Sequence, residues 1–307
     1  MSGLGAYRPA EEVYVVADVL LVGSTRMLQE PGGEQLVAGL AARGVTARWV
    51  RWDDPEVDWS AARVVAVRAT WDYHERLPEF LAWAKAVDAS SHLLNGAEAF
   101  VWNTDKAYLM ELVRAGVPVV PSQVVTDRDG LGRAAAAYRG RVVIKPCVSI
   151  GGIGLVVFDR AADVAAAAAG EADAAGLGDG PWLVQPVVES VSTEGETSVF
   201  VIGGQVTGQV RKLPAGREIR VHEQYGGRSI PVDVDAAAAE LARTTVAAAE
   251  RLLRGSLPYA RVDLMRMPDG ALVVGELEVT EPGLYLDVTP QHGEAFCDLV
   301  ARLVAPA

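Results

Sequence analysis

The stretch IKPCVSIGGIG, residues 144–154, decides the fold that the sequence predicts. Lys145 lies on an apolar strand, a turn with three glycines follows, and a second apolar run, LVVF, begins at residue 155. Glycines let backbone N–H groups approach phosphate oxygens closely, and turns of this kind bind anions. No Gly-Lys-Ser/Thr sequence opens a helix here, so the stretch is not a Walker A loop. A plain β-hairpin with a flexible turn is the structural alternative.

The sequence on both sides of this hairpin predicts further short strands joined by tight turns. Helix patterns cover residues 106–115, 161–175, 235–254 and 293–304, and strands are expected at 141–146, 155–158, 182–187, 197–202, 205–210, 259–267 and 271–280. Gly203-Gly204 is a strong hairpin signal, and Pro268-Asp269-Gly270 separates the last two strands. This part of the chain therefore favours an α+β arrangement.

Residues 13–102 have a different pattern, in which strands and helices alternate. Strands are expected at 13–23, 45–52 and 64–69, and helices at 34–43 and 77–89. This alternation predicts an α/β domain with a parallel sheet. The first strand is followed by GSTRMLQEPGG rather than G-x-G-x-x-G, which argues against an NAD-dependent oxidoreductase. We expect three units, at residues 1–102, 103–188 and 189–307.

Three acidic residues form the candidate metal site. Glu276 and Glu278 lie two apart on a strand and face one side, and Asp263 lies on the preceding strand. A two-residue turn would place Asp263 opposite Glu276, whereas a bulged turn would shift the pairing by one residue. Three carboxylates on one face repel unless a cation lies among them, and Mg²⁺ suits oxygen ligands beside nucleotide phosphates. Glu276→Gln should then raise stability in metal-free buffer. A solvated strand face is the alternative.

Basic and aromatic residues are the candidates for the substrate end. One group lies in a basic segment and comprises Arg211, Lys212, Arg217 and Arg220. Such side chains neutralise a phosphoryl group or a carboxylate, although an exposed basic loop has the same pattern. A second group comprises Arg68, Thr70 and Tyr73, at the carboxyl end of a predicted strand. Ligands bind at that end in open α/β sheets, and simple packing under a loop is the alternative.

Charge and cysteine content exclude several classes of protein. The net charge is -12 and no run of Lys or Arg occurs, which argues against a nucleic acid partner. Cys147 and Cys297 have neither disulfide nor metal spacing, so we expect a reducing cytoplasm. The early apolar run is too short to span a membrane and lacks a preceding basic segment, so neither a membrane protein nor a signal peptide is expected.

The order of these elements resembles the ATP-grasp superfamily over about residues 100–290. Lys145-Pro146 with Gly151-Gly152 is similar to the phosphate loop of bacterial glutathione synthetase, and residues 276–282 are similar to its metal strand. Residues 211–227 resemble its arginine-to-glycine segment. The segments R-x-T-W-D-Y (68–73) and W-N-x-D-K-x-Y-L (102–109) resemble a narrower group. That group includes the cycloserine-biosynthesis ATP-grasp cyclo-ligase, which closes O-ureido-serine.

The resemblance implies a role for each matching residue. Phosphate contacts are implied for Lys106, Lys145, Ser149, Gly151, Gly152 and Gly154. Adenine would be held by Gln185, Val187 and Val188, and the ribose hydroxyls by Glu196. Two Mg²⁺ ions, or Mn²⁺, would be bound by Asp263, Glu276 and Glu278. The acyl-phosphate would be stabilised by Arg211 or Arg220. Substrate choice would depend on Arg68, Thr70, Tyr73 and Lys212.

Two departures from glutathione synthetase limit what the resemblance implies. Glu278 stands where that enzyme has Asn, and His222 stands where an Asn is usual. The first keeps an oxygen ligand, but the second changes the substrate end, so glutathione is not the expected product. We expect an ATP- and Mg²⁺-dependent, ADP-forming carboxylate–amine ligase that acts through an acyl-phosphate on a small amino-acid-like substrate. The alternatives are an intramolecular cyclo-ligase and a non-catalytic nucleotide-binding regulator. The resemblance also implies a homo-oligomer, with a dimer expected.

Overall fold

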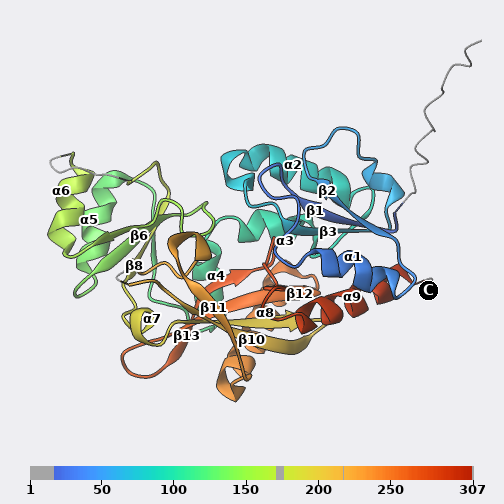
Figure 1. Ribbon diagram of the computed structural model, residues 1–307. Helices are drawn as coiled ribbons and strands as arrows, with labels where there is room; N and C mark the ends of the chain where they lie inside the picture. Colours follow the sequence, from blue (N-terminus) through green and yellow to red (C-terminus); the bar gives the residue numbers. More distant parts are fainter. Residues whose placement is uncertain (1–16, 171–175, 217, 306–307) are drawn as a thin grey trace, which may run out of the picture.

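Three β-sheets follow one another along the chain. The structure is a computed structural model that describes residues 17–170, 176–216 and 218–305. Figure 1 shows a blue-to-cyan unit on one side, a green unit at the far end, and a yellow-to-red sheet that extends beneath both. The mixed α/β fold class is confirmed, with a parallel sheet first and antiparallel sheets after it.

The first sheet is parallel, as the strand–helix alternation predicts, and has the order β2-β1-β3-β4. Its strands are β1 Val19–Gly23, β2 Ala47–Arg51, β3 Val64–Ala69 and β4 His92–Leu93. Its helices are α1 Glu34–Ala41, α2 Leu77–Asp88 and α3 Gly96–Asn103, with short 3₁₀ turns at Trp59–Ala61 and Tyr73–Glu75. Residues 13–16 of the first predicted strand lie outside the described residues. The loops after β1 and β3 leave the same sheet edge.

The second sheet is antiparallel, with the order β5-β8-β6-β7. Its strands are β5 Gln123–Val125, β6 Val142–Pro146, β7 Val156–Phe158 and β8 Trp182–Pro186. Helices α5 Arg128–Ala136 and α6 Ala161–Ala168 pack on it and on each other, and residues 171–175 of the predicted helix lie outside the description. The glycine-rich stretch connects β6 to β7, as predicted.

The third sheet is also antiparallel, with the order β11-β10-β9-β12-β13. Its strands are β9 Glu196–Ile202, β10 Gln205–Leu213, β11 Arg228–Val232, β12 Tyr259–Arg266 and β13 Leu272–Glu278. Its helices are α4 Tyr108–Arg114, α7 Ser190–Thr193, α8 Ala236–Leu253 and α9 Gln291–Val304, with a 3₁₀ turn at Glu223–Tyr225. Helix α9 contacts both this sheet and α1, so the end of the chain joins the third sheet to the first unit.

The register of the last hairpin, β12 with β13, decides between the two-residue turn and the bulged turn that the sequence left open. Three residues, 268–270, separate the paired strands, so Leu264 lies opposite Val274. An extra residue at Gly275 then shifts the pairing back, and Asp263 lies opposite Glu276. Both features occur: the longer turn offsets the register and the bulge corrects it. The three acids therefore reach one face of the sheet.

Within the described part of the chain, no helix is long and apolar enough to cross a membrane.

The Gly208→Ala substitution should destabilise the protein. A Cβ atom at residue 208 would lie 2.1 Å from Nε2 of His292, so α9 would have to move away from β10. Overpacking of this kind costs about 1–3 kcal/mol. We expect a lower Tm in thermal unfolding. Gly178→Ala is the matched control, because no atom lies within 4 Å of a Cβ there. Equal Tm values for the two variants would contradict this packing.

Candidate active site

One cleft of about 620 Å³ lies where the three sheets meet. Most residues that the sequence singled out line it: Tyr73, Lys106, Lys145, Ser149, Gly151, Gly152, Gln185, Val187, Val188, Glu196, Lys212, Arg220, Asp263, Glu276 and Glu278. Four others do not line it, namely Arg68, Thr70, Gly154 and Arg211, and Arg217 lies outside the described residues. The chain thus brings together residues as far apart in sequence as Tyr73 and Glu278, as expected for a single functional site.

Two lysines and the glycine loop form one end of the cleft. The ammonium group of Lys106 donates a hydrogen bond to the carbonyl of Ser149 and lies 3.2 Å from Oε1 of Glu276. Burial lowers the pKa of Lys145, which lies on β6 beside the same loop. Gly151, Gly152 and Gly154 all have positive φ, between 54° and 75°, which explains why the turn requires glycine. This end fits an anionic phosphate chain.

An apolar slot adjoins the lysines at the end of β8. Gln185 donates a hydrogen bond to Oγ of Ser122, at 2.7 Å, and the N–H of Val187 donates to the carbonyl of Arg141. Apolar side chains line the slot: Val120, Val143, Ile150, Val188, Met265 and Leu277. A flat aromatic base of a nucleotide suits such a lining, with polar backbone groups at the strand end.

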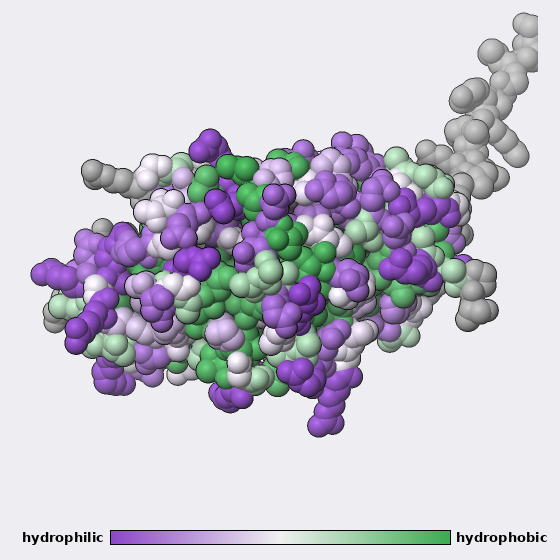
Figure 2. Space-filling view, turned by 90° about the horizontal axis from the view of Figure 1, so that it is seen from below, coloured by the Kyte–Doolittle hydropathy of each residue, from purple (hydrophilic) through white to green (hydrophobic). Residues whose placement is uncertain are grey.

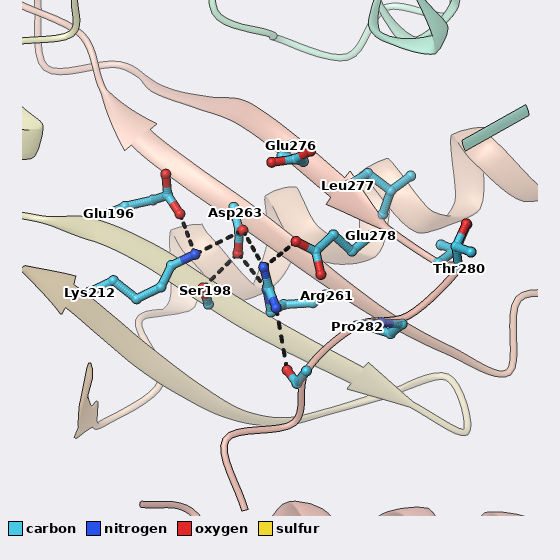
Figure 3. Close-up of polar contacts among 12 residues, drawn as sticks. Glu196, Ser198, Lys212, Arg261, Asp263, Glu276, Leu277, Glu278, Thr280 and Pro282 are labelled. Atoms are coloured by element: carbon cyan, nitrogen blue, oxygen red, sulfur yellow. Dashed lines mark hydrogen bonds and ion pairs between the residues drawn. The ribbon is translucent and has the colours of Figure 1, made fainter. Parts of the chain in front are cut away.

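Asp263, Glu276 and Glu278 converge at the centre, as Figure 3 shows. One carboxylate oxygen from each lies within 4.8 Å of the others. Three oxygen ligands at this spacing fit Mg²⁺. Burial opposes ionisation of Glu276, but Lys106 and Lys145 outweigh it and lower its pKa. The donor set therefore fits the metal that the sequence analysis expects.

Arg261 is the residue of this centre that the sequence analysis missed. It donates two hydrogen bonds to Asp263, at 3.0 and 2.9 Å, and a third to Glu278, the residue opposite it on β13. Lys212 lies 2.9 Å from Oδ2 of Asp263 and also pairs with Glu196, the residue expected to hold ribose. Positions 261 and 263 share a strand face, and the same period-two argument applied to the acids would have found Arg261.

These ion pairs overturn the expectation of uncompensated carboxylates. Glu196, Lys212, Asp263, Arg261 and Glu278 alternate in sign along one row (Figure 3). Buried charges are tolerated when they are paired and hydrogen-bonded. The carboxylates are therefore held in place by protein cations.

Arg220 lies beside the phosphate end, whereas Arg211 does not. Arg220 pairs with Glu218 at 2.6 Å and stacks over the ring of Tyr225. Its side chain contacts Gly152, and the neighbouring Gln224 donates to the carbonyl of Gly151. The side chain of Arg211 is exposed, while its neighbour Lys212 points into the cleft. Of the two arginines expected to stabilise an acyl-phosphate, geometry favours Arg220.

Arg68 is buried beneath the substrate end instead of facing it. Its guanidinium has no exposed surface and donates to Oε1 of Glu30, at 2.6 and 2.8 Å. It also donates to the carbonyl of Pro282, and Oε2 of Glu30 accepts from the N–H of Leu284. Thr70 is equally buried, and of the three residues expected to set substrate choice in this motif only Tyr73 lines the cleft. Arg68 therefore positions the segment after β13.

Comparison with known proteins identifies the class. Residues 110–289 match the family described as prokaryotic glutathione synthetase, ATP-grasp domain, which is more than half of the chain. The chain belongs to this ATP-grasp family and is a ligase that forms C–N bonds. ATP-grasp ligases use ATP and Mg²⁺, and they form amide bonds through an acyl-phosphate.

Particular relatives narrow the similarity further. Residues 19–95 match the N-terminal domain of D-cycloserine synthetase DcsG. The cycloserine biosynthesis protein DcsG of Streptomyces lavendulae is 31% identical over 276 residues, 86% of this chain and 90% of that protein. The crystal structure of D-cycloserine synthetase DcsG has a TM-score of 0.83 at 28% identity, over 94% of this chain and 99% of that one. The ATP-grasp ligase PsnB, complexed with minimal precursor, has a TM-score of 0.65 at 19% identity, over 94% and 99%, and shares the fold.

Replacing the buried Arg68 should destabilise the protein more than replacing an arginine of an exposed ion pair. Arg68→Met leaves the Glu30 carboxylate buried without a cation, which costs about 3–5 kcal/mol. The double variant Arg68→Met/Glu30→Gln removes both charges and should recover much of the loss in denaturant unfolding. Arg243→Met, at an exposed pair with Glu240, is the control and should change stability little. If Arg68→Met were as stable as Arg68→Met/Glu30→Gln, Arg68 would not be needed to compensate the buried charge of Glu30.

Glu276→Gln should abolish most of the stabilisation that Mg²⁺ with ATP gives the native protein. A ligand that binds only the folded state raises the Tm by mass action, and this variant lacks one proposed ligand. In metal-free buffer the variant should be less stable, because Glu276 pairs with Lys106 and its pKa is lowered. This reverses the expectation from sequence. Thermal-shift series with ATP, with and without Mg²⁺, test both statements, with Glu240→Gln as control. Equal Mg²⁺-dependent shifts in native protein and variant would exclude Glu276 as a ligand.

Proposed function

We propose that this enzyme activates the carboxylate of a small amino acid as an acyl-phosphate and lets an amine of the same molecule close a ring. The single observation that carries the proposal is the cleft itself. It joins the lysines and the glycine loop, a three-carboxylate centre and an end lined by Tyr73 in one cleft of about 620 Å³. Similarity to DcsG along both matched segments favours cyclisation over joining two molecules. Intermolecular ligation is the second candidate, favoured by relatives such as PsnB that act on a precursor.

Each part of the cleft has a role in this proposal. Lys106, Lys145 and the glycine loop bind the nucleotide phosphates, and Gln185 with the slot around Val188 binds the base. Asp263, Glu276 and Glu278 hold two Mg²⁺ ions, or Mn²⁺, which neutralise charge during phosphoryl transfer. Arg220 approaches the transferred group from beside the loop. Lys212 keeps Asp263 and Glu196 in position.

Broader properties belong to the same proposal. We retain the unit boundaries at 1–102, 103–188 and 189–307, each of which contains one of the three sheets. We also propose a cytoplasmic homodimer acting in natural-product biosynthesis. Figure 2 shows hydrophobic surface gathered in the middle of the underside and polar side chains around it, a distribution that supports self-association.

An ADP-release screen over small amino acids tests the function. The native enzyme should release ADP with Mg²⁺ and one substrate, without a second amine, and each ADP should accompany one product built from one substrate molecule. Mass spectrometry of the product checks this. ADP release that requires an added amine would favour intermolecular ligation, and its absence over the whole panel would refute the proposal.

A further inference from the structure

Glu281 is a cleft carboxylate whose charge is not matched by a protein cation. It lies three residues after Glu278, is 7% exposed and lines the cleft. Every other buried or half-buried cleft carboxylate has an ion pair: Glu30 with Arg68, Glu196 with Lys212, Asp263 with Lys212 and Arg261, Glu276 with Lys106, and Glu278 with Arg261. Among the residues that the structure describes, no Lys, Arg or His lies within 4.0 Å of Glu281.

Glu281 is also separate from the metal centre. The three acids whose oxygens lie within 4.8 Å of one another are Asp263, Glu276 and Glu278, and Glu281 is not among them. A carboxylate that is buried, unpaired and open to the cleft is costly without a counterion. Arg261, Lys212 and Lys106 already pair with other carboxylates. The counterion of Glu281 must therefore come from a ligand that enters the cleft.

The backbone on both sides of Glu281 is fixed. The N–H of Thr280 and its hydroxyl bond to Oδ1 of Asn103. The carbonyl of Pro282 accepts from Arg68 at 2.9 Å, and the N–H of Leu284 donates to Glu30 at 2.9 Å. This anchoring holds the residue in one place, which a recognition group needs. The Arg68–Glu30 pair therefore serves the site indirectly, because it anchors the backbone that carries Glu281.

The surroundings of Glu281 suit a small organic cation. Burial raises the pKa of Glu281 to about 7, and the Tyr73 hydroxyl, which faces its carboxylate, opposes part of that rise. Trp71, Tyr73 and Tyr285 also line the cleft and are aromatic. Aromatic faces attract ammonium groups, and a carboxylate beside them adds a charge-assisted hydrogen bond.

We propose that Glu281 binds the free ammonium group of the substrate, so that the enzyme takes amino acids and rejects the matching acids without the amine. The inference rests on the proposed ligase function and specifies its substrate class. Glu281 touches the substrate at its ammonium group and does not touch the nucleotide, so it determines specificity and leaves nucleotide binding unaffected.

Binding measurements on the full chain test the proposal independently of turnover. The probes are O-ureido-serine and its analogue without the amine, 3-(ureidooxy)propanoate, titrated at pH 8 in the presence of ADP and Mg²⁺. Four proteins are compared: the native enzyme, Glu281→Gln, Tyr73→Phe and Glu240→Gln. Glu281→Gln keeps size and loses charge, Tyr73→Phe keeps the charge and loses the hydroxyl, and Glu240→Gln removes a charge from an exposed helix face. The Kd of ADP is measured for each protein.

The native enzyme should bind the amine-bearing probe about 10- to 100-fold more tightly, the range of a hydrogen bond between charged groups. Glu281→Gln should lose this preference with an unchanged Kd for ADP. Tyr73→Phe should weaken it, because the hydroxyl that favours the charged carboxylate is lost, and Glu240→Gln should retain it. A native enzyme without preference, or a Glu281→Gln variant that keeps it, would overturn the proposal. Failure of the ligase function is a separate result, namely an ADP-release screen without turnover while the binding preference persists.

Discussion

Asp263 carries the charge on which the rest of the site depends. It is almost fully buried, and it accepts hydrogen bonds from Arg261, Lys212 and Ser198. Because both cations also hold a second carboxylate, Glu278 and Glu196 take fixed positions through the same central group. Burial of so many charges on one sheet face is possible only as a connected network. Asp263 and Glu278, two of the acids proposed to bind metal, are thus held in place by the protein alone.

The sequence was sufficient where a local pattern determines the structure. Strand β3 is apolar on both faces and begins and ends at the residues predicted, and Asp235 caps α8 through the N–H of Ala238. Strand β5 and helix α5 were missed, because β5 has three residues and α5 contains Gly130 and Gly132, which weaken a helix pattern. Gly132 nevertheless permits close contact with Ala165 of α6, so tertiary packing forms that helix.

The candidate site also contains residues that a local pattern predicts and residues whose roles depend on distant contacts. Period-two alternation placed the acids on one face, but it was applied to carboxylates alone and so omitted Arg261. Arg68 was predicted to face substrate from its position at a strand end. Its partners Glu30 and Pro282 are 38 and 214 residues away, and no local pattern reveals such a pair. The first unit therefore contributes to the substrate end through a buried clamp as well as through Tyr73.

Strand β13 lies at an edge of the third sheet, yet its free backbone groups are occupied. Tyr108 and Asn103 bond to Leu277 and Val279, and Val274 pairs with residues 118 and 120. At the opposite edge, Pro231 removes one donor from β11. An edge that is already satisfied cannot recruit a strand from another chain. Strand β13, which carries Glu276 and Glu278, therefore cannot extend the third sheet into a neighbouring chain, and it is protected from cross-β aggregation.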